Sequence, residues 1–208
     1  MIESIFTVFL VDDDGGLLKA LSRLLRAHGY EVQSFTSPKE FLTNHDGSAP
    51  GCAVFDVSMP GIDGLELQQA LTARGTQRPI IFMTGKGDIP TGIRAMKAGA
   101  IDFLTKPVDR KDLLDAIARA ADADRNNRDY HAELSSIEAK LATLTPRERE
   151  VLTHVVAGRL NKQIAGDLGT VEKTIKVHRG RVMEKLGVRT VADLVKLAGK
   201  AGIEGPVK

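Results

Sequence analysis

The sequence lacks most of the features that mark a secreted or membrane protein. Cys52 is the single cysteine among 208 residues, so no internal disulfide can form and a reducing compartment suits the chain. No run of about 18 apolar residues occurs, which argues against a transmembrane helix. The first residues also lack the basic segment and the small-residue cleavage site of a secretory signal. These absences predict a cytoplasmic protein that does not bind a membrane.

Two common cation and nucleotide motifs are also missing. After Val11 the chain reads DDDGG, which lacks the alternating aspartates of a calcium-binding loop. The stretch TGKGD, which begins at Thr84, is not preceded by the first glycine of a P-loop. The spacing therefore argues against a calcium-binding module and against a nucleotide-binding switch.

Charged residues of both signs are present, but they are distributed unevenly. The formal net charge is +2, with 42% hydrophobic and 27% charged residues, which is typical of a globular protein. Residues 1–121 and 122–140 each carry a net charge of −2, whereas residues 141–208 hold 13 basic and 7 acidic residues, a net charge of +6. A nearly neutral first part and a basic last part predict two domains, the second of which binds a polyanion.

Apolar segments rich in strand-forming residues alternate with segments of helical periodicity in the first half of the chain. Strands are expected at residues 7–11, 31–35, 52–57, 79–84 and 100–104. Helices are expected at residues 16–29, 64–75, 88–99 and 111–121. Strands and helices that alternate in this way predict a parallel, doubly wound sheet.

Polar residues stand at the carboxyl ends of these expected strands. They are Asp12 and Asp13 after the first strand, Asp56 at the third, Thr84 at the fourth and Lys106 after the fifth. Parallel sheets bind ligands beyond the carboxyl ends of their strands, so these residues are expected to converge. Mg²⁺ prefers carboxylate, carbonyl and water oxygens and typically bridges to phosphate. The pattern therefore predicts a site for Mg²⁺ and a phosphoryl group, with Lys106 and the Thr84 hydroxyl contacting the phosphoryl oxygens.

In type and order, these residues resemble the receiver domain of bacterial response regulators, over residues 7–121. The resemblance implies a flavodoxin-like α/β fold with a parallel five-stranded sheet of strand order 2-1-3-4-5. It also implies that Asp56 is the phospho-acceptor. The Mg²⁺ ligands that it implies are Asp12, Asp13, the Asp56 carboxylate and the backbone carbonyl of Ser58. The only chemistry expected is Mg²⁺-dependent phosphorylation and dephosphorylation of Asp56, so we do not expect an enzyme with an external substrate.

The same resemblance assigns roles to three further residues. Thr84 would bind the phosphoryl group, Lys106 would pair with it, and Phe103 would be the aromatic switch. An aromatic residue at a strand end is also compatible with an ordinary core position. Lys86 stands where the family leads us to expect histidine, and we assign it no role beyond an exposed loop charge.

Four residues near the predicted site are expected to be structural. Asp14 is predicted to begin a helix rather than to bind the metal. Gly61 and Gly64 are predicted to form turns, and Cys52 to be a small core residue in a strand.

Residues 122–143 are expected to form a linker helix. Polar residues and the asparagines at 126 and 127 lower the apolar density there and predict a domain boundary. A heptad-like seam nevertheless recurs, formed by Tyr130, Leu134, Ile137, Leu141 and Leu144. It covers about two heptads, so it is compatible with self-association and with a helix that packs on its own domain. The rival dimerisation surface, implied by the receiver resemblance, comprises residues 93–97 and 101–103.

The last part of the chain has the pattern of a helix-turn-helix. Thr145, followed by proline and then Glu148, is typical of a capped helix start. A short helix is expected at residues 161–168, then a turn at Gly169 and a basic helix over residues 171–187. In this arrangement the second helix enters the major groove of DNA.

Residues 144–198 are similar to the LuxR-type helix-turn-helix of the NarL/FixJ response regulators. The DNA-contacting residues implied by this resemblance are Lys173, Lys176, Val177, Arg179 and Arg181. Gly180 occupies a position where relatives can carry a basic contact, so that contact is absent here or is made by a neighbour. Val171 stands where a Ser or Thr cap is usual. His178 could contact DNA or pack within the domain.

The two resemblances together predict a two-component transcription regulator. It would consist of a receiver domain (1–121), a linker helix (122–143) and a DNA-binding domain (144–208). A sensor histidine kinase would phosphorylate Asp56, and the resulting homodimer would bind double-stranded DNA and activate transcription, with RNA polymerase as a further partner. One alternative is a phosphatase or phosphotransferase, for which no second catalytic base is evident. The other is a DNA-binding protein whose receiver serves only to dimerise, against which the complete acidic site argues.

Overall fold

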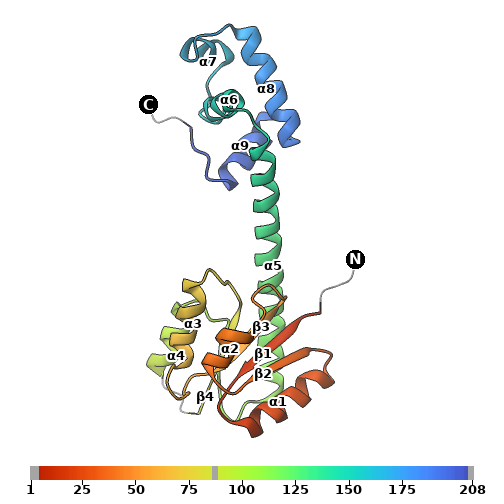
Figure 1. Cartoon of the computed structure of the whole chain (residues 1–208), viewed down its shortest axis with the longest axis vertical. Helices are drawn as coiled ribbons and strands as arrows, with labels where there is room; N and C mark the ends of the chain where they lie inside the picture. Colours follow the sequence, from red (N-terminus) through yellow and green to blue (C-terminus); the bar gives the residue numbers. More distant parts are fainter. Residues whose placement is uncertain (1–4, 86–88, 206–208) are drawn as a thin grey trace. The chain divides into compact units, whose positions relative to one another are not determined.

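Five parallel strands form one sheet in the first half of the chain (Figure 1). The computed structural model describes residues 5–85 and 89–205. Within them the strands are β1 (Thr7–Val11), β2 (Glu31–Phe35), β3 (Gly51–Asp56), β4 (Ile80–Thr84) and β5 (Asp102–Thr105). Their order in the sheet is β2-β1-β3-β4-β5, which confirms the predicted flavodoxin-like topology. The predicted strand ends differ from these bounds by at most two residues.

The helices that connect and follow the strands include one that the sequence pattern did not predict. They are α1 (Gly15–Ala27), α2 (Pro38–Asn44), α3 (Gly64–Ala73), α4 (Ile89–Lys97) and α5 (Arg110–Ala142). The missed helix, α2, is 7 residues long, which is too short for helical periodicity to stand out. Its start does carry a signal, because the Ser37 hydroxyl accepts a hydrogen bond from the Glu40 backbone N–H and Pro38 is the first helical residue.

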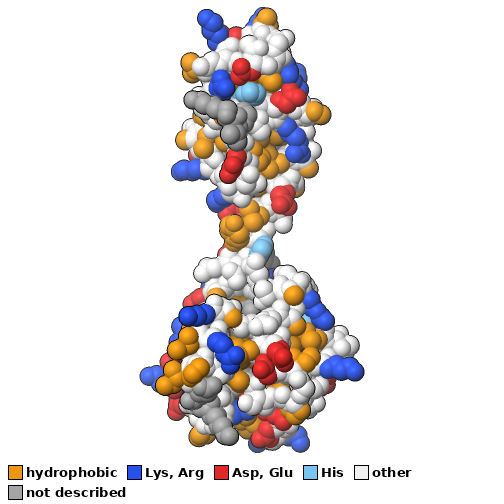
Figure 2. Space-filling view, turned by 90° about the vertical axis from the view of Figure 1, so that its left-hand side faces the viewer, with side chains coloured by type: hydrophobic (Ala, Val, Ile, Leu, Met, Phe, Trp, Pro, Cys, Tyr) orange, Lys and Arg blue, Asp and Glu red, His pale blue; other side chains and the backbone are white. Residues whose placement is uncertain are grey.

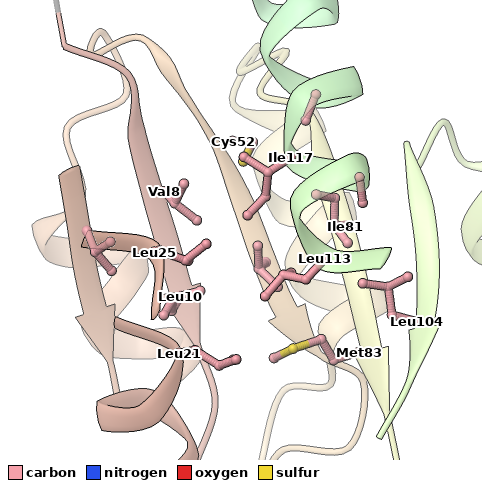
Figure 3. Packing of buried hydrophobic residues seen from close by; sticks show 14 of the residues in the cluster. Val8, Leu10, Leu21, Leu25, Cys52, Ile81, Met83, Leu104, Leu113 and Ile117 are labelled. Carbon is pink, nitrogen blue, oxygen red and sulfur yellow. The ribbon is translucent and has the colours of Figure 1, made fainter. Parts of the chain in front are cut away.

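Helices cover both faces of the sheet, and a separate apolar cluster fills each interface. On the face shown in Figure 3, α1 and α5 pack on the strands through residues such as Leu25 and Ile117. On the other face, α2 and α3 pack through Phe41 and Leu67. Burial on both faces explains why β1, β3 and β4 are almost entirely apolar instead of alternating. Polar residues are therefore concentrated at the strand ends.

The chain divides into two compact units, Met1–Arg128 and Asp129–Lys208. In the second unit, α6 (Pro146–Val156), α7 (Asn161–Asp167), α8 (Glu172–Leu186) and α9 (Val191–Lys200) surround an apolar core. A turn at Gly169, with φ of 62°, separates α7 from α8, as the helix-turn-helix pattern predicts. α9 was not predicted from the sequence, although the Thr190 side chain caps it by accepting a hydrogen bond from the Asp193 N–H.

α5 runs for 33 residues without interruption, so the asparagines at 126 and 127 lower its apolar density without ending it. Of the predicted seam, Ile137, Leu141 and Leu144 are buried in the core of the second unit, whereas Tyr130 is 53% exposed. This burial supports the interpretation in which the seam packs on its own domain. Neither α5 nor any other helix in the described part of the chain is both long enough and apolar enough to cross a membrane.

The starts of α6 and α8 differ in the way that the sequence predicts. At α6, the Thr145 hydroxyl accepts a hydrogen bond from the Glu148 N–H, and the Glu148 carboxylate accepts one from the Thr145 N–H. Glu148 also pairs with Lys185 of α8 at 2.6 Å, so the cap connects two helices. At α8, Val171 is the N-cap residue and provides no side-chain cap.

Candidate functional site

Three carboxylates meet at the carboxyl edge of the sheet. Asp12 follows β1 and is fully buried, Asp56 ends the neighbouring β3 and is 5% exposed, and Asp13 is exposed. β1 and β3 pair in parallel with Val11 opposite Phe55, so the residues that follow lie side by side. One oxygen from each carboxylate lies within 4.8 Å of the others. The sheet thus brings together the aspartates that the sequence analysis places at one edge.

Lys106 contributes a positive charge to this acidic cluster. It follows β5, and its backbone N–H donates to the carbonyl oxygen of Thr84 at 2.7 Å, which fixes it beside the end of β4. Its Nζ lies 2.7 Å from Asp12 Oδ2 and 3.2 Å from Asp56 Oδ1. The ammonium group therefore bridges carboxylates that belong to two different strands.

The charged groups of the site shift one another's pKa values. Burial raises the pKa of Asp56, Lys106 opposes this change, and the nearby Asp12 carboxylate adds to it. Burial alone would lower the pKa of Lys106, but its hydrogen bond and charge interactions with the two aspartates raise that pKa above its usual value. A further cation beside Asp56 would favour the ionised carboxylate.

Asp14 caps α1, as predicted, and its carboxylate is not part of the cluster. Its side chain accepts hydrogen bonds from the N–H groups of Leu17 and Gly16 at 3.1 and 2.8 Å, and these bonds lower its pKa. The Asp14 backbone N–H donates to Asp12 Oδ1 at 2.9 Å. The start of α1 therefore also holds the buried Asp12 carboxylate in position.

The remaining predicted residues of the receiver site also lie at strand ends or beside them. Thr84 is the last residue of β4 and is buried. Phe103 in β5 is half-buried and lies opposite Phe82, with the two ring centroids 6.5 Å apart. Ser58 is exposed two residues beyond β3, and its backbone N–H forms a hydrogen bond with the Asp56 carboxylate. Lys86 and Asp88 lie outside the described residues.

Gly64 corrects one prediction. Gly64 was predicted both as a turn glycine and as the first residue of a helix over residues 64–75, and the second prediction is confirmed, because Gly64 is the first residue of α3. A Cβ atom at this position would lie 2.4 Å from the carbonyl oxygen of Asp56 and 3.1 Å from the Phe82 ring. Glycine is therefore required because α3 begins against the strand end that carries Asp56. Gly61, with φ of 88°, is a turn glycine as predicted.

The chemistry of the donor set fits a hard divalent cation. The available ligand atoms are carboxylate oxygens, two of them on buried residues and one on the exposed Asp13. Mg²⁺ binds such oxygens and usually keeps several waters, so a cluster with one exposed side suits it. The Asp12, Asp13 and Asp56 carboxylates could therefore hold Mg²⁺.

α8 presents a surface that combines basic residues with one apolar side chain. Its buried side is formed by Ile175, Val182 and Leu186. The exposed side, which we call the α8 basic face, is formed by Lys173, Lys176, Val177 and Arg181. Val177 is 48% exposed, so an apolar side chain lies among the positive charges of this surface. Four of the five predicted DNA contacts thus share one surface.

Arg179 does not belong to that surface. Around the helix it lies about 40° from Ile175 and about 60° from Val182, on the buried side of α8. It is half-buried, and its Nη1 donates to Asn161 Oδ1 at 2.9 Å. His178 is also half-buried, with a buried Nδ1 that has no hydrogen-bond partner among the described residues, which favours packing over DNA contact.

Comparison with known proteins supports both halves of this description. Residues 8–118 match the family described as the response regulator receiver domain, and residues 142–198 match the bacterial regulatory proteins of the luxR family. Nodulation protein W of Bradyrhizobium diazoefficiens is 42% identical over 94% of this chain and 86% of its own length. The transcriptional regulatory protein FixJ of the same organism is 38% identical, over 94% and 96% of the two chains.

Two solved structures are also similar over most of this chain. The response regulator StyR is 46% identical, with a TM-score of 0.81 over 93% of this chain and 98% of StyR. Full-length FixJ from B. japonicum is 38% identical, with a TM-score of 0.58 over 95% and 97% of the two chains.

A receiver domain joined to a LuxR-type DNA-binding domain defines a two-component transcription regulator. The chain belongs to the NarL/FixJ family of response regulators. Receiver domains of this kind typically bind Mg²⁺, in agreement with the acidic cluster. A receiver implies a sensor kinase as partner, and the LuxR-type domain implies DNA.

Proposed function

We propose that Asp56 accepts a phosphoryl group from a sensor histidine kinase and that this event controls DNA binding by the second unit. The observation that carries the proposal is the Lys106 ammonium group, which bridges Asp12 and Asp56 inside a cluster of three carboxylates. A single structural ion pair would need one carboxylate. The additional acidic groups fit a site that receives a cation and a phosphoryl group.

The residues present can perform this transfer directly. A carboxylate oxygen of Asp56 would attack the phosphorus atom of phosphohistidine, the P–N bond would break, and histidine would leave with the bonding electron pair. The product on Asp56 is an acyl phosphate. Lys106 Nζ, 3.2 Å from the acceptor carboxylate, would pair with the phosphoryl oxygens, and the Thr84 hydroxyl would donate a hydrogen bond to one of them.

Mg²⁺ belongs to this proposal as the cofactor of the site. When bound, it would offset the negative charge of the phosphoryl oxygens. Its proposed ligands are the carboxylates of Asp12, Asp13 and Asp56 and the backbone carbonyl of Ser58.

Phe103 is proposed to connect the phosphoryl site to the surface of α4. A Cβ atom at Gly92 of α4 would lie 3.4 Å from the Phe103 ring, so ring and helix are in contact. α4 exposes Ile89, Ile93 and Met96 by 75%, 50% and 47%. On the side of the first unit that carries α4, hydrophobic side chains gather beside basic ones (Figure 2). We place the phosphorylation-dependent dimer interface here, since the α5 seam has three of its residues buried in the second unit.

The α8 basic face would enter the major groove of DNA. The phosphorylated dimer would activate transcription in the cytoplasm, with RNA polymerase as a further partner. In this proposal each part of the chain has one role. Residues 1–121 receive the signal, residues 122–143 connect the domains, and residues 144–208 bind DNA.

The test compares the wild type with Asp56→Asn, with and without acetyl phosphate and Mg²⁺. We expect the phosphodonor to label the wild type, raise its sedimentation mass to that of a dimer and tighten its binding to duplex DNA, because all three depend on the acyl phosphate. Asp56→Asn should show none of these changes. Asp115→Asn removes an exposed carboxylate of α5 and should behave as the wild type.

The outcomes separate the alternatives. Labelling of Asp56→Asn would refute the assignment of the acceptor. A dimer in every sample, with equal DNA affinity, would mean that the receiver serves only to dimerise.

A further inference from the structure

The hydrogen bond between Arg179 and Asn161 joins the two helices of the helix-turn-helix. Asn161 is the first residue of α7, and α7 and α8 pack against each other (Figure 1). Arg179 Nη1 donates to Asn161 Oδ1 at 2.9 Å, and both residues are half-buried. The bond therefore fixes a long, flexible side chain against the neighbouring helix.

The partner that fixes Arg179 is neutral. Arg179 forms no ion pair with the acidic residues of the described chain, and the amide of Asn161 leaves its charge uncompensated. A guanidinium group has five N–H donors, and the bond to Asn161 uses one of them. The positive charge is thus not neutralised by an acidic side chain of the described residues, and an external anion could pair with it.

The position of Arg179 indicates which part of DNA this anion belongs to. The α8 basic face, which would meet the base edges, lies on the side opposite Ile175 and Val182. Arg179 lies about 60° around the helix from Lys176, between the buried side and the α8 basic face, so it stands at the edge of the surface that enters the groove. A cation at the flank of a recognition helix faces the sugar–phosphate backbone.

We infer that Asn161 is a positioning residue that holds the Arg179 guanidinium for a DNA backbone phosphate beside the groove. The inference rests on the proposed DNA binding by α8. It assigns Arg179 a contact that is independent of base sequence, in contrast to Lys176 and Val177. Holding the side chain in advance reduces the ordering that DNA binding would otherwise require.

The experiment measures the affinity of the full chain for a short duplex of mixed sequence at several salt concentrations. Arg179→Ala should weaken binding about tenfold, and the slope of log K against log salt should fall by about 0.9, the value for one phosphate contact. Asn161→Ala should weaken binding less, because the charge remains but is no longer held. The double variant should be no weaker than Arg179→Ala alone, since both changes remove one contact. Lys196→Ala removes an exposed charge from α9 and is the control.

A second pair of variants separates positioning from structural support. Asn161→Asp keeps an acceptor for Arg179 but neutralises its charge, so the thermal unfolding midpoint should be retained while DNA affinity falls. Gln163→Glu adds the same charge to α7 away from Arg179 and should reduce affinity less.

Two results would overturn the inference. The first is a double variant whose loss of DNA affinity equals the sum of the losses of the two single variants. The second is a lower thermal stability of Asn161→Ala and Arg179→Ala with no change in DNA affinity or in the salt slope. Failure of the underlying function looks different, because Lys176→Ala would then also leave duplex binding unchanged.

Discussion

Lys106 is the residue that connects the charged groups of the candidate phosphoryl site. Its ammonium group contacts carboxylates from two strands, and it is the group that opposes the raised pKa of Asp56. Removing it would leave two buried carboxylates close together without a counter-charge. Substitution of Lys106 therefore tests the role of this side chain separately from the roles of the proposed metal ligands.

For Lys106→Ala we expect Mg²⁺ binding to remain while phosphorylation no longer changes DNA affinity. The lysine supplies no metal ligand, and its loss removes a cation that competes for the same carboxylates. A Mg²⁺ titration followed by DNA binding with and without phosphodonor measures both effects, with Lys39→Ala, an exposed lysine of α2, as the control. Loss of Mg²⁺ binding would show instead that Lys106 holds the metal ligands in place.

At Gly180 we expect a substitution that increases DNA affinity. Gly180 is exposed on α8, and a Cβ atom there would meet nothing within 4 Å. Gly180→Lys should tighten DNA binding and raise the salt slope by about 0.9, because it adds one phosphate contact next to the α8 basic face. Gly180→Ala separates this charge effect from the gain in helix propensity of about 1 kcal/mol. Equal affinities of the two variants would place Gly180 away from DNA.

The positions of some residues of the site can be predicted from the sequence, and the positions of others cannot. Those at strand ends can be placed from the sequence, because apolar runs show where each strand stops and parallel pairing brings the ends together. Gly64 and Arg179 cannot be placed in this way. Their environments depend on Asp56 and Asn161, which belong to other elements, and no local pattern records such an approach.

At the scale of elements, the start of α6 in the second unit is held by side chains from two helices. Thr145 and Glu148 form the cap that the sequence predicts, and Lys185 of α8 completes it. Hydrogen bonds from Lys185 and from the Thr145 backbone lower the pKa of Glu148 from 4.5 to about 2. One carboxylate therefore stabilises both a helix start and a contact between helices.

Glu148→Gln should lower the free energy of unfolding by about 2 kcal/mol at neutral pH, because Lys185 loses its charged partner. The pKa of Glu148 is lower in the folded chain than in the unfolded chain, so its contribution is present above pH 4.5 and disappears as the pH falls toward about 2. Urea unfolding of both proteins should show their difference shrinking in acid. Glu150→Gln, which removes an exposed partner of Arg147, should cost less than about 1 kcal/mol. A difference that persists in acid would contradict this account.

Elements were predictable where the surrounding pattern was strong, since α7 has 7 residues, like α2, but was predicted within the helix-turn-helix pattern. The strands follow from continuous apolar runs, whereas α2 has 7 residues and α9 has 10, and both are marked mainly by their caps. The polar residues near 126 predicted a domain boundary, and α5 continues through them because a polar segment can remain helical when its ends are packed.

At the scale of the whole chain, the uneven charge was an accurate guide to organisation. The nearly neutral first part holds a sheet with a carboxylate cluster, and the basic last part holds a helix-turn-helix with exposed cations. Charge alone could not identify the proposed surface of self-association. That choice depends on burial, which separates the exposed residues of α4 from the largely buried seam of α5.

Lys106 also has a consequence for ion selection at the edge of the sheet. Three carboxylates and one ammonium group leave this edge with two negative charges. A divalent ion cancels them, whereas a monovalent ion leaves a residual charge and a trivalent ion reverses the sign. The lysine that we propose to pair with the phosphoryl group would therefore also set the valence of the ion that the site accepts.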